Sequence, residues 1–126
     1  MPPLVVFWFR RDLRLQDNHG LSQALGAARA RDFAVLPVFI FDTDILSDLP
    51  KNDARVTFIA DCLADLQLTL AKQGRAFCLF HGRPTEVFAE LLEKHDIRAV
   101  FCNEDYEPSA IARDRAVKQQ LNARGV

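Results

Sequence analysis

The chain has 126 residues, of which 49% are hydrophobic and 26% are charged, and its formal net charge is −1. This composition is typical of one globular domain and excludes a disordered segment, and the near-zero charge excludes a general attraction to nucleic acid or membranes. No apolar run reaches the ~18 residues of a membrane span, and no signal peptide is recognisable. The three cysteines fit neither a disulfide framework nor a metal motif, so we expect a reducing, cytoplasmic setting.

The first half of the chain is predicted to contain two strands, each followed by a helix. Residues 4–9 form a continuous apolar run, which is typical of a strand covered on both faces. Either Asp17 or Asn18 can cap the helix that follows. Residues 33–41 are again apolar and predict a second strand. Proline donates no ladder hydrogen bond, which argues against a central strand, so Pro37 is expected to mark the start of the strand or an irregularity.

The second half repeats this alternation of strand and helix. Apolar residues at unbroken helical spacing predict a long helix over residues 53–74, with a cap at its start and a glycine at its end. A short strand is predicted over residues 76–80, and Pro84 suits the first turn of the next helix. Residues 99–102 predict the fourth strand, and Pro108 opens the last helix.

Four repeats of strand and helix predict an α/β fold. We expect a Rossmann-like three-layer sandwich with a parallel sheet, right-handed crossovers and strand order 3-2-1-4. Gly125 stands where a helix C-cap glycine belongs, and Val126 would begin a fifth strand. We therefore expect residues 1–126 to be a fragment whose fifth strand is truncated, and the open sheet edge would allow the fragment to self-associate through edge strands.

The familiar catalytic and binding motifs are absent from the sequence. It contains no phosphate-binding glycine loop, no HExxH zinc motif and no GxSxG nucleophile elbow. The histidines His19, His81 and His95 are far apart, and we interpret them as surface or strand-end residues rather than metal ligands. Trp8 and Cys102 lie on predicted strands and are interpreted as core residues. No catalytic residue and no metal site is predicted.

Polar side chains are concentrated where the predicted strands end. With strand order 3-2-1-4, the crevice between strands one and four is the expected ligand position. The polar residues that follow strands one, two and four are Arg10, Arg11, Arg14, Asp42, Asp44, Asn103, Glu104, Asp105 and Glu107. Arg55, in the first turn of the long helix, is expected to point to the same edge, where a cation opposes the helix dipole unless an anionic partner is close. The pattern is compatible both with a ligand at this carboxyl edge and with solvated loops.

Three segments of the chain resemble the DNA photolyase and cryptochrome family. They are residues 7–18 (FWFRRDLRLQDN), residues 37–42 (PVFIFD) with residues 53–56 (DARV) after them, and residues 100–108 (VFCNEDYEP) with Arg113-Asp114 a turn later. Each motif alone is weakly specific. Together they occur in the family's order and cover most of the chain.

The resemblance implies an N-terminal α/β domain that binds a light-harvesting antenna chromophore: a methenyltetrahydrofolate, a deazaflavin or a flavin, depending on the family member. It implies that excitation passes to a reduced FAD in a separate C-terminal helical domain, and that the flavin then splits a cyclobutane pyrimidine dimer flipped out of damaged DNA. That helical domain is absent from this chain. The parent protein would therefore be the deoxyribodipyrimidine photolyase, a carbon–carbon lyase, and the chain alone would not repair DNA.

The resemblance also implies which residues contact the antenna. Carried over by motif, they are Phe39, Phe41, Asp42, Arg55, Asn103, Glu104, Asp105 and Glu107. Carboxylates and the asparagine amide can bond the edge of a pterin or flavin-like ring, and phenylalanines can cover its face. Arg55 can pair with an anionic group or hold Asp105. The turn at residues 10–14 is interpreted as mainly structural, with its arginines pairing with the acidic turn across the switch point or with the absent domain.

Two alternatives stay open at this point. A cryptochrome, a photoreceptor without repair activity, would share this domain. A stand-alone nucleotide-binding α/β module, related to electron-transfer flavoproteins or stress proteins, would bind an adenine nucleotide without a helical domain. The missing glycine-rich loop argues against this second alternative.

Overall fold

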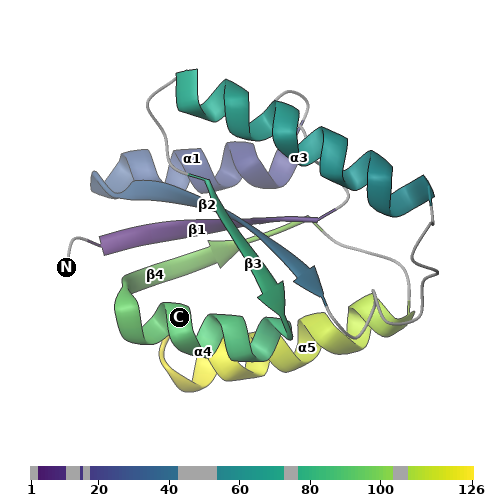
Figure 1. Ribbon diagram of the computed structural model, residues 1–126. Coiled ribbons are helices and arrows are strands. Elements are labelled where there is room, and N and C mark those ends of the chain that lie inside the picture. The colour runs from purple at the N-terminus through teal and green to yellow at the C-terminus, as the bar shows by residue number, and fades with distance from the viewer. Residues whose placement is uncertain (1–2, 11–14, 16–17, 43–53, 73–76, 104–107) are drawn as a thin grey trace.

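A four-stranded parallel sheet forms the middle layer of the molecule (Figure 1). The computed structural model describes residues 3–10, 15, 18–42, 54–72, 77–103 and 108–126, apart from the side chains of residues 54–58 and 108–109. The strands are β1 (Pro3–Phe9), β2 (Ala34–Asp42), β3 (Cys78–Gly82) and β4 (Asp96–Phe101). Their order is β3-β2-β1-β4 and each neighbouring pair is parallel, which confirms the predicted α/β fold and strand order 3-2-1-4.

Helices cover both faces of this sheet, as Figure 1 shows. α1 (His19–Arg31) and α3 (Ala54–Lys72) lie on one face, and α4 (Pro84–Lys94) and α5 (Pro108–Ala123) lie on the other. β1 and β4 are neighbours, but the helices that follow them, α1 and α5, lie on opposite faces. The predicted topological switch point therefore lies between β1 and β4. None of the helices in the described part of the chain is long and apolar enough to cross a membrane.

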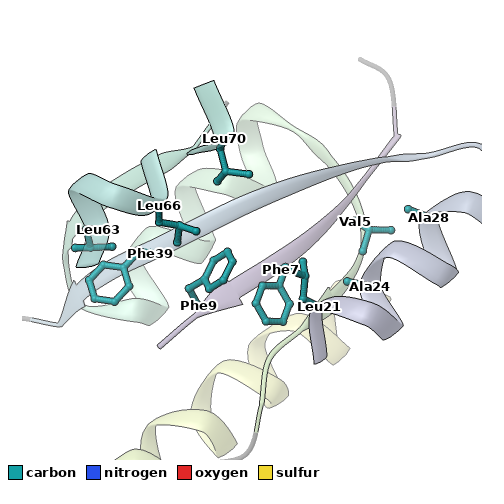
Figure 2. Packing of buried hydrophobic residues seen from close by; sticks show 10 residues of the cluster. All are labelled: Val5, Phe7, Phe9, Leu21, Ala24, Ala28, Phe39, Leu63, Leu66 and Leu70. Carbon is teal, nitrogen blue, oxygen red and sulfur yellow. The ribbon is translucent and has the colours of Figure 1, made fainter. Parts of the chain in front are cut away.

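The side chains of β1 alternate between two hydrophobic clusters, one on each face of the sheet. Val5, Phe7 and Phe9 belong to the cluster drawn in Figure 2, which α1 and α3 cover. Val6 and Trp8 belong to the second cluster, which α4 and α5 cover. All five side chains are at most 3% exposed, which confirms Trp8 as a core residue. A strand buried on both faces is uniformly apolar, and this explains the unbroken apolar run near the N-terminus.

Pro37 lies inside β2, so the expectation that it marks the start of the strand or an irregularity was wrong. β2 pairs with β1 from Ala34 to Phe39, but with β3 only from Val38 onward. Pro37 therefore lies in the part of β2 that has a partner strand on one side. A missing N–H is tolerated there as it is on an edge strand.

The strand boundaries differ most from the prediction in β3 and β4. β4 spans Asp96–Phe101 rather than residues 99–102, and β3 spans Cys78–Gly82 rather than residues 76–80. The start of β4 was missed because it is polar: Ile97 is buried, but Asp96 is half-buried and Arg98 is exposed. β4 is an edge strand of the described sheet, and such a strand does not need a continuous apolar run.

Local signals place the helix starts correctly where the structure describes them. Asn18, one of the two candidate caps, accepts a backbone N–H of α1 at 3.1 Å. Pro84 occupies the first turn of α4, as predicted. The second candidate cap, Asp17, lies outside the described residues, as do Asp53 and Gly74, the predicted ends of the long helix.

Candidate functional site

Asn103, which follows β4, is hydrogen-bonded to the start of α1. Its Oδ1 accepts the Gly20 N–H at 2.8 Å, and its Nδ2 donates to Asn18 Oδ1 at 2.8 Å. The same Asn18 oxygen accepts the Leu21 N–H at 3.1 Å. The side-chain amide of Asn103 therefore satisfies a helix N–H that has no partner within α1 and orients the helix cap. These contacts tie the end of β4 to the helix that follows β1.

Gly20 has no space for a side chain. A Cβ at this position would lie 2.6 Å from Asn103 Oδ1 and 3.0 Å from Phe7 Cε2. A Cβ on Gly26, in the same helix, would meet nothing within 4 Å. Glycine at position 20 is therefore required for the close approach of α1 to the end of β4.

We expect Gly20→Ala and Gly26→Ala to change the free energy of unfolding in opposite directions. Gly20→Ala should lower it by about 1–3 kcal/mol, because Asn103 and Phe7 must move to admit the methyl group. Gly26→Ala should raise it by about 0.5–1 kcal/mol, because alanine loses less backbone entropy in a helix. Urea denaturation followed by circular dichroism measures both values. Changes of the same sign would contradict the described contact between α1 and Asn103.

Arg10, the residue after β1, is buried and contacts a backbone carbonyl, a carboxylate and an aromatic ring. Only 9% of the residue is exposed. Its Nη1 donates to the Asn103 carbonyl at 2.8 Å, and its Nη2 forms an ion pair with the Asp114 carboxylate of α5. Its guanidinium carbon lies 4.5 Å from the centre of the Trp8 ring. The carboxylate, the carbonyl and the ring face together compensate for removing this cation from water.

Arg113 of α5 extends these contacts to the end of β2. Its Nη1 lies 3.3 Å from Asp42 Oδ2, and its Nε lies 3.4 Å from Asp114 Oδ1, the oxygen that also contacts Arg10. Its guanidinium carbon lies 5.2 Å from the centre of the Trp8 ring. We define the rim network as Arg10, Asp42, Asn103, Arg113 and Asp114. It joins the carboxyl ends of β2, β1 and β4 to α5.

The predicted aromatic contacts lie on the other face of the sheet. Phe39 is 7% exposed and belongs to the cluster beneath α3, and the half-buried Phe41 packs against that cluster. Their ring centres are 5.0 Å apart in an edge-to-face arrangement. The exposed His81 ring of β3 lies 6.4 Å from the Phe41 ring and is tilted by 36°. Because side chains alternate along β2, Asp42 faces α5 whereas the two phenylalanines face α3.

The structure therefore divides the predicted site residues between the two faces. Asp42 and Asn103 belong to the rim network, and Phe39 and Phe41 lie on the α3 side. Arg55 is the second residue of α3 and lies in its first turn as predicted, but its side chain is not described. The predicted polar residues that lie outside the described part of the chain are Arg11, Arg14, Asp44, Glu104, Asp105 and Glu107.

The arginines of the turn at residues 10–14 were predicted to pair with the acidic turn or with the absent domain. Arg10 contacts the Asn103 carbonyl at the start of that acidic turn, but its contact with Asp114 of α5 was not predicted. The sequence did contain a signal for Asp114, because it shares a helical stripe with Ala110 and Val117, which are 1% and 3% exposed. A carboxylate on a buried stripe needs a cationic partner. Sequence reasoning also missed His81 as a neighbour of Phe41.

The cysteines and the remaining titratable groups give no metal site among the described residues. No group of three or more described His, Cys, Asp or Glu side chains could hold a metal ion. The interpretation of Cys102 as a core residue was wrong: β4 ends at Phe101, and the thiol beyond it is exposed.

Burial raises the pKa of the Cys78 thiol on β3. A hydrogen bond from Arg98 lowers the pKa of Asp96 on β4.

The sequence is similar to photolyases and cryptochromes along nearly its whole length. The family model described as DNA photolyase matches residues 5–126. The chain is 35% identical to a deoxyribodipyrimidine photo-lyase of Synechococcus. The 122 aligned residues cover 97% of this chain and 24% of that protein. It is 36% identical to Cryptochrome-1 of Drosophila melanogaster. The 116 aligned residues cover 90% of this chain and 21% of that protein.

The fold is similar to solved structures of a photolyase and a cryptochrome from other organisms. A class III photolyase from Agrobacterium tumefaciens superposes with a TM-score of 0.84 at 31% identity, covering 100% of this chain and 25% of that one. A Synechocystis cryptochrome superposes with a TM-score of 0.86 at 24% identity, and at that identity the likeness concerns the fold alone. This chain thus spans about a quarter of the length of these photolyases. Because the family match extends over residues 5–126, the chain belongs to the DNA photolyase family and corresponds to the N-terminal α/β region of its members.

Proposed function

We propose that residues 1–126 are the antenna-binding N-terminal domain of a longer deoxyribodipyrimidine photolyase. The observation that carries the proposal is the match to the Synechococcus photolyase. The match covers 97% of this chain but only 24% of that photolyase. In this proposal the C-terminal helical domain of the parent holds FAD, binds damaged DNA and splits cyclobutane pyrimidine dimers. The net charge of −1 supports a DNA-binding surface elsewhere in the parent. The free cysteines support a reducing, cytoplasmic setting.

The described residues at the carboxyl edge suit a planar chromophore with a polar rim. Phe41 is half-buried and His81 is exposed, so two aromatic side chains are at least partly accessible on the α3 side of β2 and β3. We assign the contacts to Phe39, Phe41, Asp42, Arg55, Asn103, Glu104, Asp105 and Glu107. The carboxylates would accept hydrogen bonds from N–H groups of the ring edge. A bound methenyltetrahydrofolate, deazaflavin or flavin would absorb light and pass its excitation to FAD.

Two of the assigned residues are oriented by other residues of this chain. Arg113 holds the Asp42 carboxylate at 3.3 Å. The Asn103 amide accepts from Gly20 and donates to Asn18, both at 2.8 Å. In the proposal, Asn103 therefore contributes mainly by fixing where the chain leaves β4.

The first test measures chromophore binding to the 126-residue chain. Trp8 is its single tryptophan, so energy transfer from Trp8 reports a bound chromophore that absorbs near-ultraviolet light. We expect one of three probes (methenyltetrahydrofolate, 8-hydroxy-5-deazaflavin or flavin mononucleotide) to quench Trp8 emission to saturation. ATP is the control, with binding measured by calorimetry. Binding of ATP and of none of the three probes would support the nucleotide-binding module instead.

The second test uses the full-length parent as purified. Its absorption spectrum, and the chromophores released on denaturation, should show FAD together with a second pigment. Under illumination it should repair DNA that contains pyrimidine dimers. A parent that holds both pigments but repairs nothing would favour the cryptochrome alternative, for which the 36% identity to Cryptochrome-1 is the specific observation. A parent that holds FAD alone would reject the antenna role.

Two substitutions in the parent test the assigned residues. Arg55→Ala and Asp105→Ala should each lower antenna occupancy at least ~10-fold while FAD stays bound, because a hydrogen bond to a charged group contributes about 1.5–3 kcal/mol. Lys72→Ala is the matched control, since it removes a cation from the last turn of the same helix. Pigment released from each purified variant measures occupancy. Full occupancy in both variants would reject the assignment.

A further inference from the structure

Asp114 is the shared acceptor of the rim network. Its Oδ1 contacts Nη2 of Arg10 and lies 3.4 Å from Nε of Arg113. Arg10 connects it to the Asn103 carbonyl at 2.8 Å, and Arg113 connects it to Asp42 at 3.3 Å. A continuous path of polar contacts therefore runs from the end of β4 to the end of β2.

An aromatic surface supports this path. The guanidinium carbons of Arg10 and Arg113 lie 4.5 and 5.2 Å from the centre of the Trp8 ring. Trp8 is 3% exposed, and its ring packs edge-to-face against Phe88 with ring centres 5.2 Å apart. Contact with a fixed ring restricts both arginine side chains.

We propose that Arg10 and Asp114 are positioning residues for the chromophore site, because they hold the ends of β2 and β4 at a fixed separation. β1 lies between β2 and β4, so no ladder hydrogen bonds join these two strands. The rim network supplies a connection between their ends. Its consequence for ligand binding rests on the proposed function, whereas the connection itself does not.

Arginine is required at position 10 because it reaches two acceptors at once. Nη1 donates to the Asn103 carbonyl while Nη2 contacts the Asp114 carboxylate. A lysine has one ammonium group and no planar fork, so Arg10→Lys keeps the charge but loses this bridge. Asp114→Asn keeps the shape of the acceptor and removes its charge. The two variants interrupt the same path from opposite sides, and both changes are conservative.

The first arm of the test needs no ligand. The Gly20 N–H donates to Asn103 Oδ1 at 2.8 Å, so its hydrogen exchange reports whether Asn103 keeps its place. We expect Arg10→Lys and Asp114→Asn to speed exchange at Gly20 at least ~10-fold relative to Ala28 in the same helix, as loss of a charged hydrogen bond implies.

Val117→Ala is the matched control for this arm. It truncates a side chain of α5 that is 3% exposed and leaves the rim network intact. It should speed exchange at Gly20 and Ala28 by the same factor, since it lowers stability without interrupting the path. A Gly20-to-Ala28 ratio that stays at the wild-type value in both rim variants would overturn the proposal.

The second arm uses flavin mononucleotide as the probe and calorimetry as the measurement. We expect the Kd to rise ~10-fold in both rim variants and to stay within about twofold of wild type in Val117→Ala. An equal loss of affinity in all three variants would mean that binding follows stability, and the positioning role would be rejected. If the wild-type chain does not bind the probe, the flavin form of the proposed function fails, and the Gly20 arm still decides whether the rim network holds the end of β4.

Discussion

Phe88→Ala is expected to lower the free energy of unfolding by about 3–5 kcal/mol. Phe88 of α4 is 0% exposed, and its ring packs edge-to-face on Trp8 of β1. Truncation removes apolar burial, leaves a cavity between the helix layer and the sheet, and deletes an aromatic pair that contributes about 0.5–1.5 kcal/mol. Thermal unfolding should begin roughly 10–20 °C lower.

Leu68→Ala is the control for this prediction. Leu68 is also a large apolar side chain on a helix, but it is 62% exposed. Its truncation should change the free energy of unfolding by no more than about 0.5 kcal/mol. Urea denaturation measures the free energy of unfolding of both variants, and both curves are fitted with the same dependence of that free energy on urea concentration. A cost below about 1 kcal/mol for Phe88→Ala would show that α4 does not pack on β1 as described.

Asp114→Ala is expected to lower the free energy of unfolding by about 3 kcal/mol, because it removes a carboxylate that contacts the buried Arg10 cation. The Arg10 side chain is 7% exposed and that of Asp114 is 28% exposed. We expect a value at the lower end for such pairs, because Arg10 keeps the Asn103 carbonyl and the Trp8 ring face. The exposed pair of Glu90 and Lys94 is the matched control, with side chains 53% and 65% exposed. Glu90→Ala should cost no more than about 0.5 kcal/mol.

A double-mutant cycle separates the ion pair from the shape of the side chains. Arg10→Met combined with Asp114→Ala should cost about 1–3 kcal/mol less than the sum of the two single variants, since the double variant buries no unpaired charge. Urea denaturation of the three variants and the wild type gives the coupling energy. Additive costs would show that Arg10 and Asp114 do not interact across the switch point.

The fold could be predicted because its largest signals are local. The apolar run of β1 reflects burial on both faces. Asn18 and Pro84 mark helix starts because of their effects on the first turn of the same helix. The start of β4 and the place of Pro37 in the middle of β2 could not be predicted in this way. Both depend on where the neighbouring strand pairs, and that neighbour is distant in the sequence.

The position of Asp42 and Asn103 at one edge of the sheet was also predictable, but the contacts that join them were not. Parallel strands bring their carboxyl ends to one edge, which places Asp42 and Asn103 in the same region from the strand order alone. Because successive side chains of a strand point to opposite faces, the sequence alone could have placed Asp42 and Phe41 on different faces of the sheet. The contact of Arg10 with Asp114 could not have been found, because it depends on how α5 packs across the sheet.

The two arginines beside Trp8 also affect how readily this ring can be oxidised. An indole that loses an electron becomes a radical cation, and guanidinium charges at 4.5 and 5.2 Å from its centre repel that positive charge. Removing an electron from Trp8 should therefore be harder than from a tryptophan in neutral surroundings. The single indole of the chain is therefore a poor electron donor, as the antenna role proposed above requires of a domain that transfers excitation energy and no electrons.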